Sequence, residues 1–138
     1  MAIAKWSALS TETNIAGTAL DNKANGTTTF IADIDNTTNR DLYLSLWFNF
    51  ASFTTTAPAP SITVILRGKR SGVYAENNIE TWTLNLTGGA GTRAFSLEHV
   101  LRIPKGGTYG LYWASNLGAN TASSGNSLFS ATFGEEIV

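Results

Sequence analysis

A single histidine, His99, is the only residue of this 138-residue chain that could act as the general base of a serine hydrolase triad. The chain lacks the GxSxG motif that presents a serine nucleophile on a sharp turn. With one histidine and no cysteine, a zinc site built from several His or Cys ligands is excluded by counting. In the stretch RAFSLEHVLRI, His99 alternates with Phe95, Leu97 and Leu101, and this pattern predicts a partly buried strand residue.

The stretch DIDNTTNRD, residues 33–41, places acidic, amide and hydroxyl side chains at alternating positions, as the calcium-binding loop of an EF-hand does. However, its sixth position is Thr38 instead of glycine, and its twelfth is Leu44 instead of a bidentate glutamate. Both flanks are typical of strands, whereas an EF-hand loop joins two helices. We therefore predict a hairpin turn capped by Asx side chains, and a looser calcium-binding loop stays open as the alternative.

Other motifs of enzymes and nucleotide-binding proteins are incomplete. Glu76 and Glu80 flank a turn, and nothing places them in a cleft as the acid pair of a glycosidase. The glycine loop TGGAGT, residues 87–92, lacks the Lys-Ser/Thr of a P-loop. The basic run RGKR, residues 67–70, has no second basic cluster near it in the sequence, and the net charge is −1. We expect no enzymatic activity, no cofactor, no bound metal and no nucleic-acid partner.

The composition predicts a small β-rich domain with a surface that favours association. Only 14% of the residues are charged, compared with about 25% in average soluble domains. Low charge at a net of −1 weakens repulsion between copies of a protein. The N-terminus MAIAKWSALS has no long apolar run, and no segment approaches the roughly 20 apolar residues of a membrane helix. We expect a protein that is made in the cytosol, has no membrane partner, and stays soluble or assembles.

Strand patterns recur at regular spacing from Thr27 onward, separated by turns rich in Gly, Pro and Asn. They fall at residues 27–34, 41–50, 61–68, 80–86, 93–103, 108–115 and 127–138. This spacing predicts an all-β fold, a single-domain antiparallel β-sandwich over residues 27–138. About eight strands and long connections favour a jelly-roll-like arrangement over an immunoglobulin-like one. Residues 1–26 have only a weak strand signal, and we interpret them as an N-terminal arm or a loop.

The pattern of each strand predicts which side chains face the core. In the strand 27–34, we expect Phe30, Ala32 and Ile34 to share one face. In DLYLSLWFNF, residues 41–50, alternate Leu and Phe residues predict a core face, whereas Tyr43 and Trp47 point the other way. The rings of Tyr43 and Trp47 would be exposed to water unless another segment packs over them, and there are two candidates for that segment. One is the loop TTTAPAP of the same chain, and the other is a neighbouring subunit.

Three stretches, FIADIDNTTNRDLYLSLWFNF, SITVILRGK and RIPKGGTYGLYWASN, resemble the small β-sandwich proteins of tailed-phage virions. Their pattern of strands and turns is closest to that of capsid decoration, or cement, proteins with a jelly-roll core. The resemblance covers the chain from Thr27 to its end. It implies a protein of the virion capsid surface that is synthesised in the host cytoplasm. Such proteins sit on the capsid lattice, often as trimers, and clamp neighbouring capsomers. The family has no catalytic residues to carry over.

These observations predict a non-enzymatic virion structural protein, a capsid decoration protein whose partners are the major capsid protein and copies of itself as a homotrimer. The expected contact residues are Trp6, Tyr43, Trp47 and Tyr112. One alternative is a tail or fibre module of a virion. Another is a carbohydrate-binding β-sandwich module, because such modules use exposed Trp and Tyr side chains as platforms for sugar rings.

Overall fold

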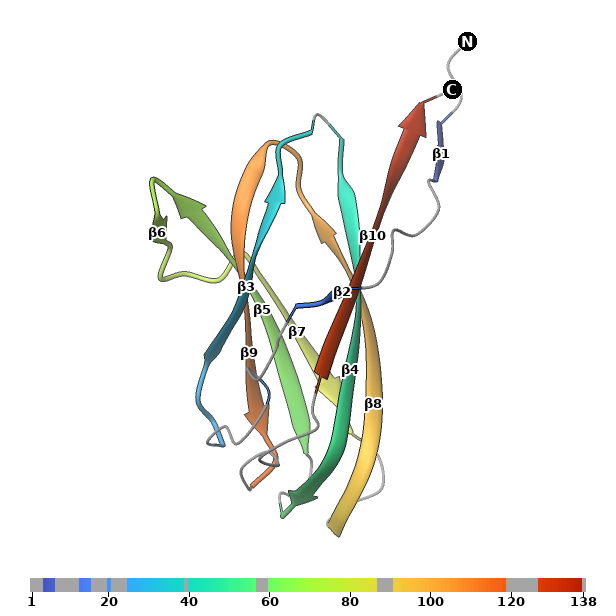
Figure 1. Ribbon diagram of the computed structural model, residues 1–138. Helices are drawn as coiled ribbons and strands as arrows, with labels where there is room; N and C mark the ends of the chain where they lie inside the picture. The colour runs from blue at the N-terminus through green and yellow to red at the C-terminus, as the bar shows by residue number, and fades with distance from the viewer. Residues whose placement is uncertain are drawn as a thin grey trace.

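The computed structural model describes residues 4–6, 13–15, 20, 25–38, 40–56, 60–86, 91–118 and 127–137, and these form an all-β protein (Figure 1). In this part of the chain, no helix is long and apolar enough to cross a membrane. The strands are β1 (Ala4–Trp6), β2 (Thr13–Asn14), β3 (Thr29–Asn36), β4 (Leu42–Thr55), β5 (Ser61–Arg70), β6 (Val73–Tyr74), β7 (Glu80–Asn85), β8 (Gly91–Ile103), β9 (Gly107–Asn116) and β10 (Ser127–Ile137).

Two antiparallel sheets face each other and form a sandwich (Figure 1). One has the order β2-β10-β4-β8, and β1 also pairs with β10. The other has the order β3-β9-β5-β7, and β6 also pairs with β5. The pairs β2–β10, β3–β9, β4–β8 and β5–β7 are nested, as in one long hairpin whose arms wrap around a core. This nesting is that of a jelly roll, so the predicted jelly-roll sandwich is confirmed.

The inner faces of β4 and β9 supply the centre of the core. Leu46, Phe48 and Phe50 of β4 and Leu111 of β9 are 0% exposed, and Trp113 is 1% exposed. Each such side chain contributes roughly 1.5–3 kcal/mol when it is fully buried. The alternation of residues 42–50 therefore works as predicted, with one face of β4 in the core and the other outside.

A β-bulge in β3 changes the predicted faces of that strand. We expected Phe30, Ala32 and Ile34 on one face, and this was wrong for Phe30. The register shifts between Phe30 and Ala32, so that Phe30 pairs with Tyr112 while Ala32 pairs with Leu111. The extra residue in the bulge reverses the alternation. As a result, Phe30 lies on the outer face of the sheet, where it is 42% exposed.

The described parts of residues 1–26 contact the sandwich. β1 pairs with the end of β10, and β2 pairs with its start. Leu20 is 0% exposed and belongs to the core. The side-chain Oδ1 of Asn25 accepts hydrogen bonds from the amides of Leu117 (2.7 Å) and Gly118 (3.1 Å). That part of this segment reaches neighbouring molecules stays a prediction.

β4 is longer than the sequence pattern indicated. It continues to Thr55 through a register shift between Phe50 and Phe53, so the first residues of the predicted loop TTTAPAP belong to the strand. Residues 57–59 of that loop lie outside the described residues. The proposal that this loop covers Tyr43 and Trp47 therefore stays a prediction.

Candidate functional site

The four predicted contact residues lie in three different places. Tyr43 and Trp47 are on the outer face of β4, whereas Tyr112 is on the outer face of β9 in the opposite sheet. Trp6 is in β1, where its backbone pairs with Glu135 of β10. The structure thus brings Tyr43 and Trp47 together, and it does not bring Tyr112 to the same surface. That these residues contact a partner stays a prediction.

The outer surface of β4 and β8, which we call the β4 face, contains the first pair. The face consists of Tyr43, Ser45, Trp47, Asn49, Ser96, Glu98, Val100 and Arg102. Trp47 is 44% exposed and Val100 is 45% exposed. Val100 was missed as a candidate, although its place in the alternation of residues 93–103 already indicated the outward face.

The backbones of β10 and β8 pair with β4 on its two sides. In the pairing of β10 with β4, Phe129 lies opposite Trp47 and Phe133 lies opposite Tyr43. On the other side of β4, Glu98 lies opposite Trp47 and Val100 lies opposite Ser45. Directly opposite residues are the closest neighbours in an antiparallel pair. Trp47 therefore lies on a middle strand of the sheet, with Glu98 as its direct neighbour on β8.

The charges of the β4 face gather at one end of it. Arg102 binds the carboxylate of Asp41 through its Nε (2.8 Å) and Nη2 (2.7 Å) atoms. The hydrogen bond from Arg102 lowers the pKa of Asp41, and the same contact raises the pKa of Arg102. Near the opposite end, the hydroxyl of Ser96 donates to Oδ1 of Asn49 at 3.1 Å. Glu98 is the one charged residue between these two contacts.

Tyr112 belongs to an aromatic cluster on the other sheet, formed by Phe30, Tyr74 and Tyr112. The ring centroids are 5.5 Å apart for Phe30–Tyr74 and Phe30–Tyr112, and 5.9 Å apart for Tyr74–Tyr112. The guanidinium of Arg67 lies 4.7 Å from the centre of the Tyr112 ring, and the ammonium of Lys69 lies 4.9 Å from that of Tyr74. Such contacts stabilise a surface cluster by about 0.5–1 kcal/mol each. They also leave Tyr112 half-buried, so it is not an open platform.

Asp33 anchors the aromatic cluster. Its carboxylate accepts hydrogen bonds from the ammonium of Lys69 (2.7 Å) and the hydroxyl of Tyr74 (2.6 Å). These two bonds lower the pKa of Asp33 and raise the pKa values of Lys69 and Tyr74. Gly110 makes the cluster possible, because a Cβ there would lie 2.8 Å from ring carbons of Tyr74. Only a residue without a side chain fits beneath these rings.

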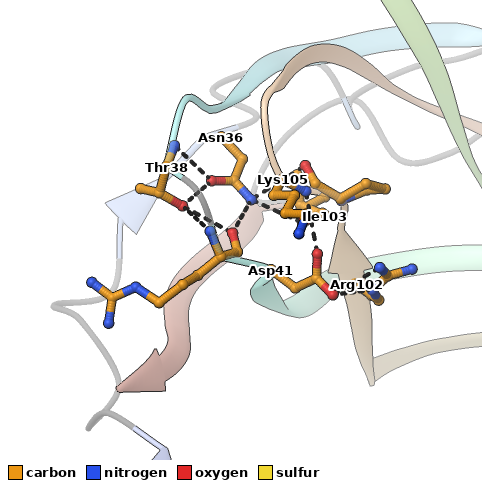
Figure 2. A network of polar contacts seen from close by, with 8 residues as sticks. Asn36, Thr38, Asp41, Arg102, Ile103 and Lys105 are labelled. Carbon is orange, nitrogen blue, oxygen red and sulfur yellow. Dashed lines mark hydrogen bonds and ion pairs between the residues drawn. The ribbon is translucent and has the colours of Figure 1, made fainter. Parts of the chain in front are cut away.

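The turn between β3 and β4 is held by a buried asparagine (Figure 2). Asn36 is 0% exposed. Its Nδ2 lies 2.9 Å from the carbonyl oxygen of Arg40, 3.0 Å from that of Ile103 and 3.2 Å from that of Pro104. Its Oδ1 accepts hydrogen bonds from the amide and the hydroxyl of Thr38. The predicted Asx cap is present, but the predicted hairpin was wrong, because β3 and β4 belong to different sheets and do not pair. The amide also ties this turn to the one between β8 and β9.

The acidic residues around this turn have other contacts. Asp33 is bound by Lys69 and Tyr74, and Asp41 is bound by Arg102. Among the residues that the structure describes, no three His, Cys, Asp or Glu side chains come together as a possible metal site. The looser calcium-binding loop considered above therefore has no support from these side chains.

His99 lies half-buried on the inner side of β8, opposite Leu46 of β4. Its ring centre is 5.2 Å from that of Trp82. Burial lowers the pKa of His99, so the neutral imidazole is favoured. Its Nε2 is buried, and within the described part of the chain it has no hydrogen-bond partner. The residue belongs to the edge of the core and shows no catalytic partner at Nε2.

No known family model matches the chain, and no curated protein is significantly similar to it in sequence. A jelly roll by itself does not define a function, because the same fold serves many unrelated activities. The surfaces of the molecule must therefore support any functional assignment. Of these, the β4 face carries two nearly half-exposed apolar side chains, Trp47 and Val100, on adjacent strands of one regular sheet.

Proposed function

We propose that the protein is a non-enzymatic structural component of a tailed-phage virion. In this proposal it is a capsid decoration protein that binds the major capsid protein and copies of itself. The observation that supports it best is the exposure of Trp47 and Val100 at the centre of the β4 face. The resemblance of the strand and turn pattern to decoration proteins supplies the virion context.

The chemistry of the β4 face suits a protein contact. The centres of protein interfaces are enriched in aromatic residues and depleted of charged ones. Trp is also over-represented among the residues whose truncation costs most binding energy. Trp47 has these properties, because it is an exposed aromatic residue and Glu98 is the one charged residue of the β4 face away from the Arg102–Asp41 end. The Arg102–Asp41 ion pair at one end of the β4 face would fix the orientation of the bound partner more than it would raise the affinity for it.

The support beneath the β4 face also suits a binding surface. The residues before and after Trp47 are Leu46 and Phe48, and both are 0% exposed. Their burial holds the backbone of Trp47 against the core. A surface that is rigid before binding loses little conformational entropy when its partner arrives. The low charge of the chain, 14%, reduces repulsion between neighbouring copies on a lattice.

The test combines the mass of the protein in solution with binding to capsids of the virus that encodes it. We expect an oligomer in sedimentation equilibrium and co-sedimentation with capsids. Trp47→Ala should weaken both by at least about tenfold, the range of a strong interface anchor. Phe30→Ala is the matched control, because Phe30 is 42% exposed but lies on the opposite sheet. A strictly monomeric protein without affinity for capsids would contradict the proposal.

One further observation favours a second function at the same tryptophan. Trp47 is bordered by Glu98 and by the hydrogen-bonded pair of Asn49 and Ser96. An exposed aromatic ring beside such polar groups can stack on a sugar ring and bind its hydroxyls. Glycan arrays with the parent and Trp47→Ala proteins would distinguish this function. Binding that disappears with Trp47→Ala would favour a carbohydrate-binding module, and an empty array would count against it.

The position of the protein in the virion is a separate question. A tail or fibre module with the same fold would use the same β4 face on a different neighbour. Electron microscopy of particles labelled on this protein would separate the two locations. Label on the head supports the decoration protein, and label confined to the tail supports the alternative.

A further inference from the structure

The sandwich has a depression of about 720 Å³ at the end where β3 and β5 finish and β9 begins. We call it the terminal depression. The polar residues that line it are Thr37, Lys69, Arg70, Lys105, Thr108 and Tyr109. Its volume is within the range of small-molecule sites, roughly 300–1,000 Å³. None of its lining residues belongs to the β4 face, so it is a separate surface.

The charge of the terminal depression is positive. Lys69, Arg70 and Lys105 line it, and no carboxylate is among the described residues that line it. Asp35 pairs with Thr108, but it is not among the described residues that line the depression. In the described part of the chain, neither Arg70 nor Lys105 forms an ion pair. These two cations are therefore available to an anionic ligand.

The carboxylates close to these cations are already engaged elsewhere. Asp33 binds the ammonium of Lys69 and the hydroxyl of Tyr74, which reduces the contribution of Lys69 to the depression. Asp41 binds Arg102, and it accepts the backbone amide of Lys105 rather than its ammonium (3.3 Å). Both carboxyl groups have lowered pKa values and stay ionised in these contacts. Neither of them forms an ion pair with Arg70 or Lys105, although Asp41 attracts the charge of Lys105 from a distance.

The walls of the depression are held in place by the chain itself. The buried amide of Asn36 binds the carbonyl oxygens of Ile103 and Pro104, and so joins the turn that contains Thr37 to the turn that contains Lys105 (Figure 2). Gly107 leaves room for the hydroxyl of Tyr109, since a Cβ there would lie 2.6 Å from that oxygen. A site that is formed before binding costs less to occupy.

We propose that the terminal depression binds an anionic sugar. Arg70 and Lys105 bind its phosphate or carboxylate group, since cationic donors form the strongest hydrogen bonds with such groups. The hydroxyls of Thr37 and Thr108 bind the hydroxyls of the sugar. Ile79, which also lines the depression and is 45% exposed, packs against the apolar face of the ring. The depression has too few cations for a nucleic-acid backbone, which needs an extended basic stripe.

The test measures binding by calorimetry to four probes: glucose 6-phosphate, glucuronate, glucose and inorganic phosphate. We expect the two charged sugars to bind more tightly than glucose or inorganic phosphate alone. The comparison of glucose 6-phosphate with glucuronate identifies which anionic group is preferred. Affinity should also fall as salt is raised, because the contact is between charges. Equal affinity for glucose, or no binding of either charged sugar at millimolar concentration, would overturn the proposal.

Single substitutions locate the binding. Arg70→Gln and Lys105→Gln should each weaken binding of the preferred sugar about tenfold, as expected for one charge-assisted hydrogen bond. Arg67→Gln is the matched control, because Arg67 is on the same strand but lies over Tyr112 and not in the depression. Binding that is unchanged by Arg70→Gln and Lys105→Gln would refute the site. Trp47→Ala should bind the sugar like the parent, so this test is independent of the proposed capsid function.

Discussion

Replacing the buried Asn36, the last residue of β3, by alanine should destabilise the protein strongly. The side chain is 0% exposed, and Nδ2 reaches three carbonyl oxygens while Oδ1 accepts two hydrogen bonds from Thr38. Nδ2 has only two hydrogens, so two full bonds from it exist at a time. The alanine side chain replaces none of these contacts.

The expected loss follows from the hydrogen bonds of Asn36. Two of them contribute about 1 kcal/mol each, and leaving a buried carbonyl without its partner adds about 1–2 kcal/mol. The sum, about 3 kcal/mol, is a large part of the 5–15 kcal/mol that is typical of small domains. For a domain of this size it should lower the melting temperature by about 10 °C.

Urea unfolding and thermal melting of Asn36→Ala, followed by tryptophan fluorescence, measure this loss. Asn49→Ala is the matched control, because Asn49 is on the β4 face and should cost less than about 1 kcal/mol. Asn36→Asp keeps the shape but puts a carboxylate oxygen against three carbonyl oxygens, so it should cost more than alanine at neutral pH. A loss below about 1 kcal/mol for Asn36→Ala would refute the reasoning.

Three further predictions concern the core, the aromatic cluster and the pH dependence. Phe48→Ala should cost about 3–5 kcal/mol and Trp47→Ala under about 1 kcal/mol in urea unfolding, because these neighbours lie on opposite faces of β4. Equal losses would mean that Trp47 is covered from within the chain. Gly110→Ala should cost about 1–3 kcal/mol, because its Cβ would meet the ring of Tyr74. The cost should shrink in the double variant with Tyr74→Ala. His99 has a lowered pKa in the folded state, so the unfolded state binds its proton first as the pH falls. Stability measured by urea unfolding should therefore decrease below the ordinary pKa of 6.5, and His99→Gln should remove that decrease.

The alternation of residues in single strands predicted most of the fold. In β4 and β8, the residues expected in the core are buried or half-buried wherever their side chains are described, and those expected outside are half-buried or exposed, as for Trp47 and Val100. Successive side chains of a strand point to opposite faces, so the pattern can be interpreted without knowing the neighbouring strands. The same reasoning was wrong for Phe30, because a bulge depends on how β3 pairs with β9.

The candidate surfaces were predicted less completely than the strands. Trp47 and Tyr43 were identified as outward residues of one strand, and they do share the β4 face. Tyr112 was grouped with them, but the core lies between its sheet and theirs. The partners of Tyr112 in the aromatic cluster, Phe30 and Tyr74, come from strands that are distant in the sequence. No local pattern indicates such a contact.

The sequence by itself determined that this protein is an all-β sandwich, and it showed which face of β4 enters the core. It also predicted an Asx cap in the turn before Asp41, and Asn36 provides it. Only the tertiary structure decided that Asn36 joins two turns, that Arg70 and Lys105 line one depression, and that Tyr112 and Trp47 are on opposite sheets. The physical reason is that strand faces follow from the local geometry of the backbone, whereas surfaces depend on which distant strands pair and in what register.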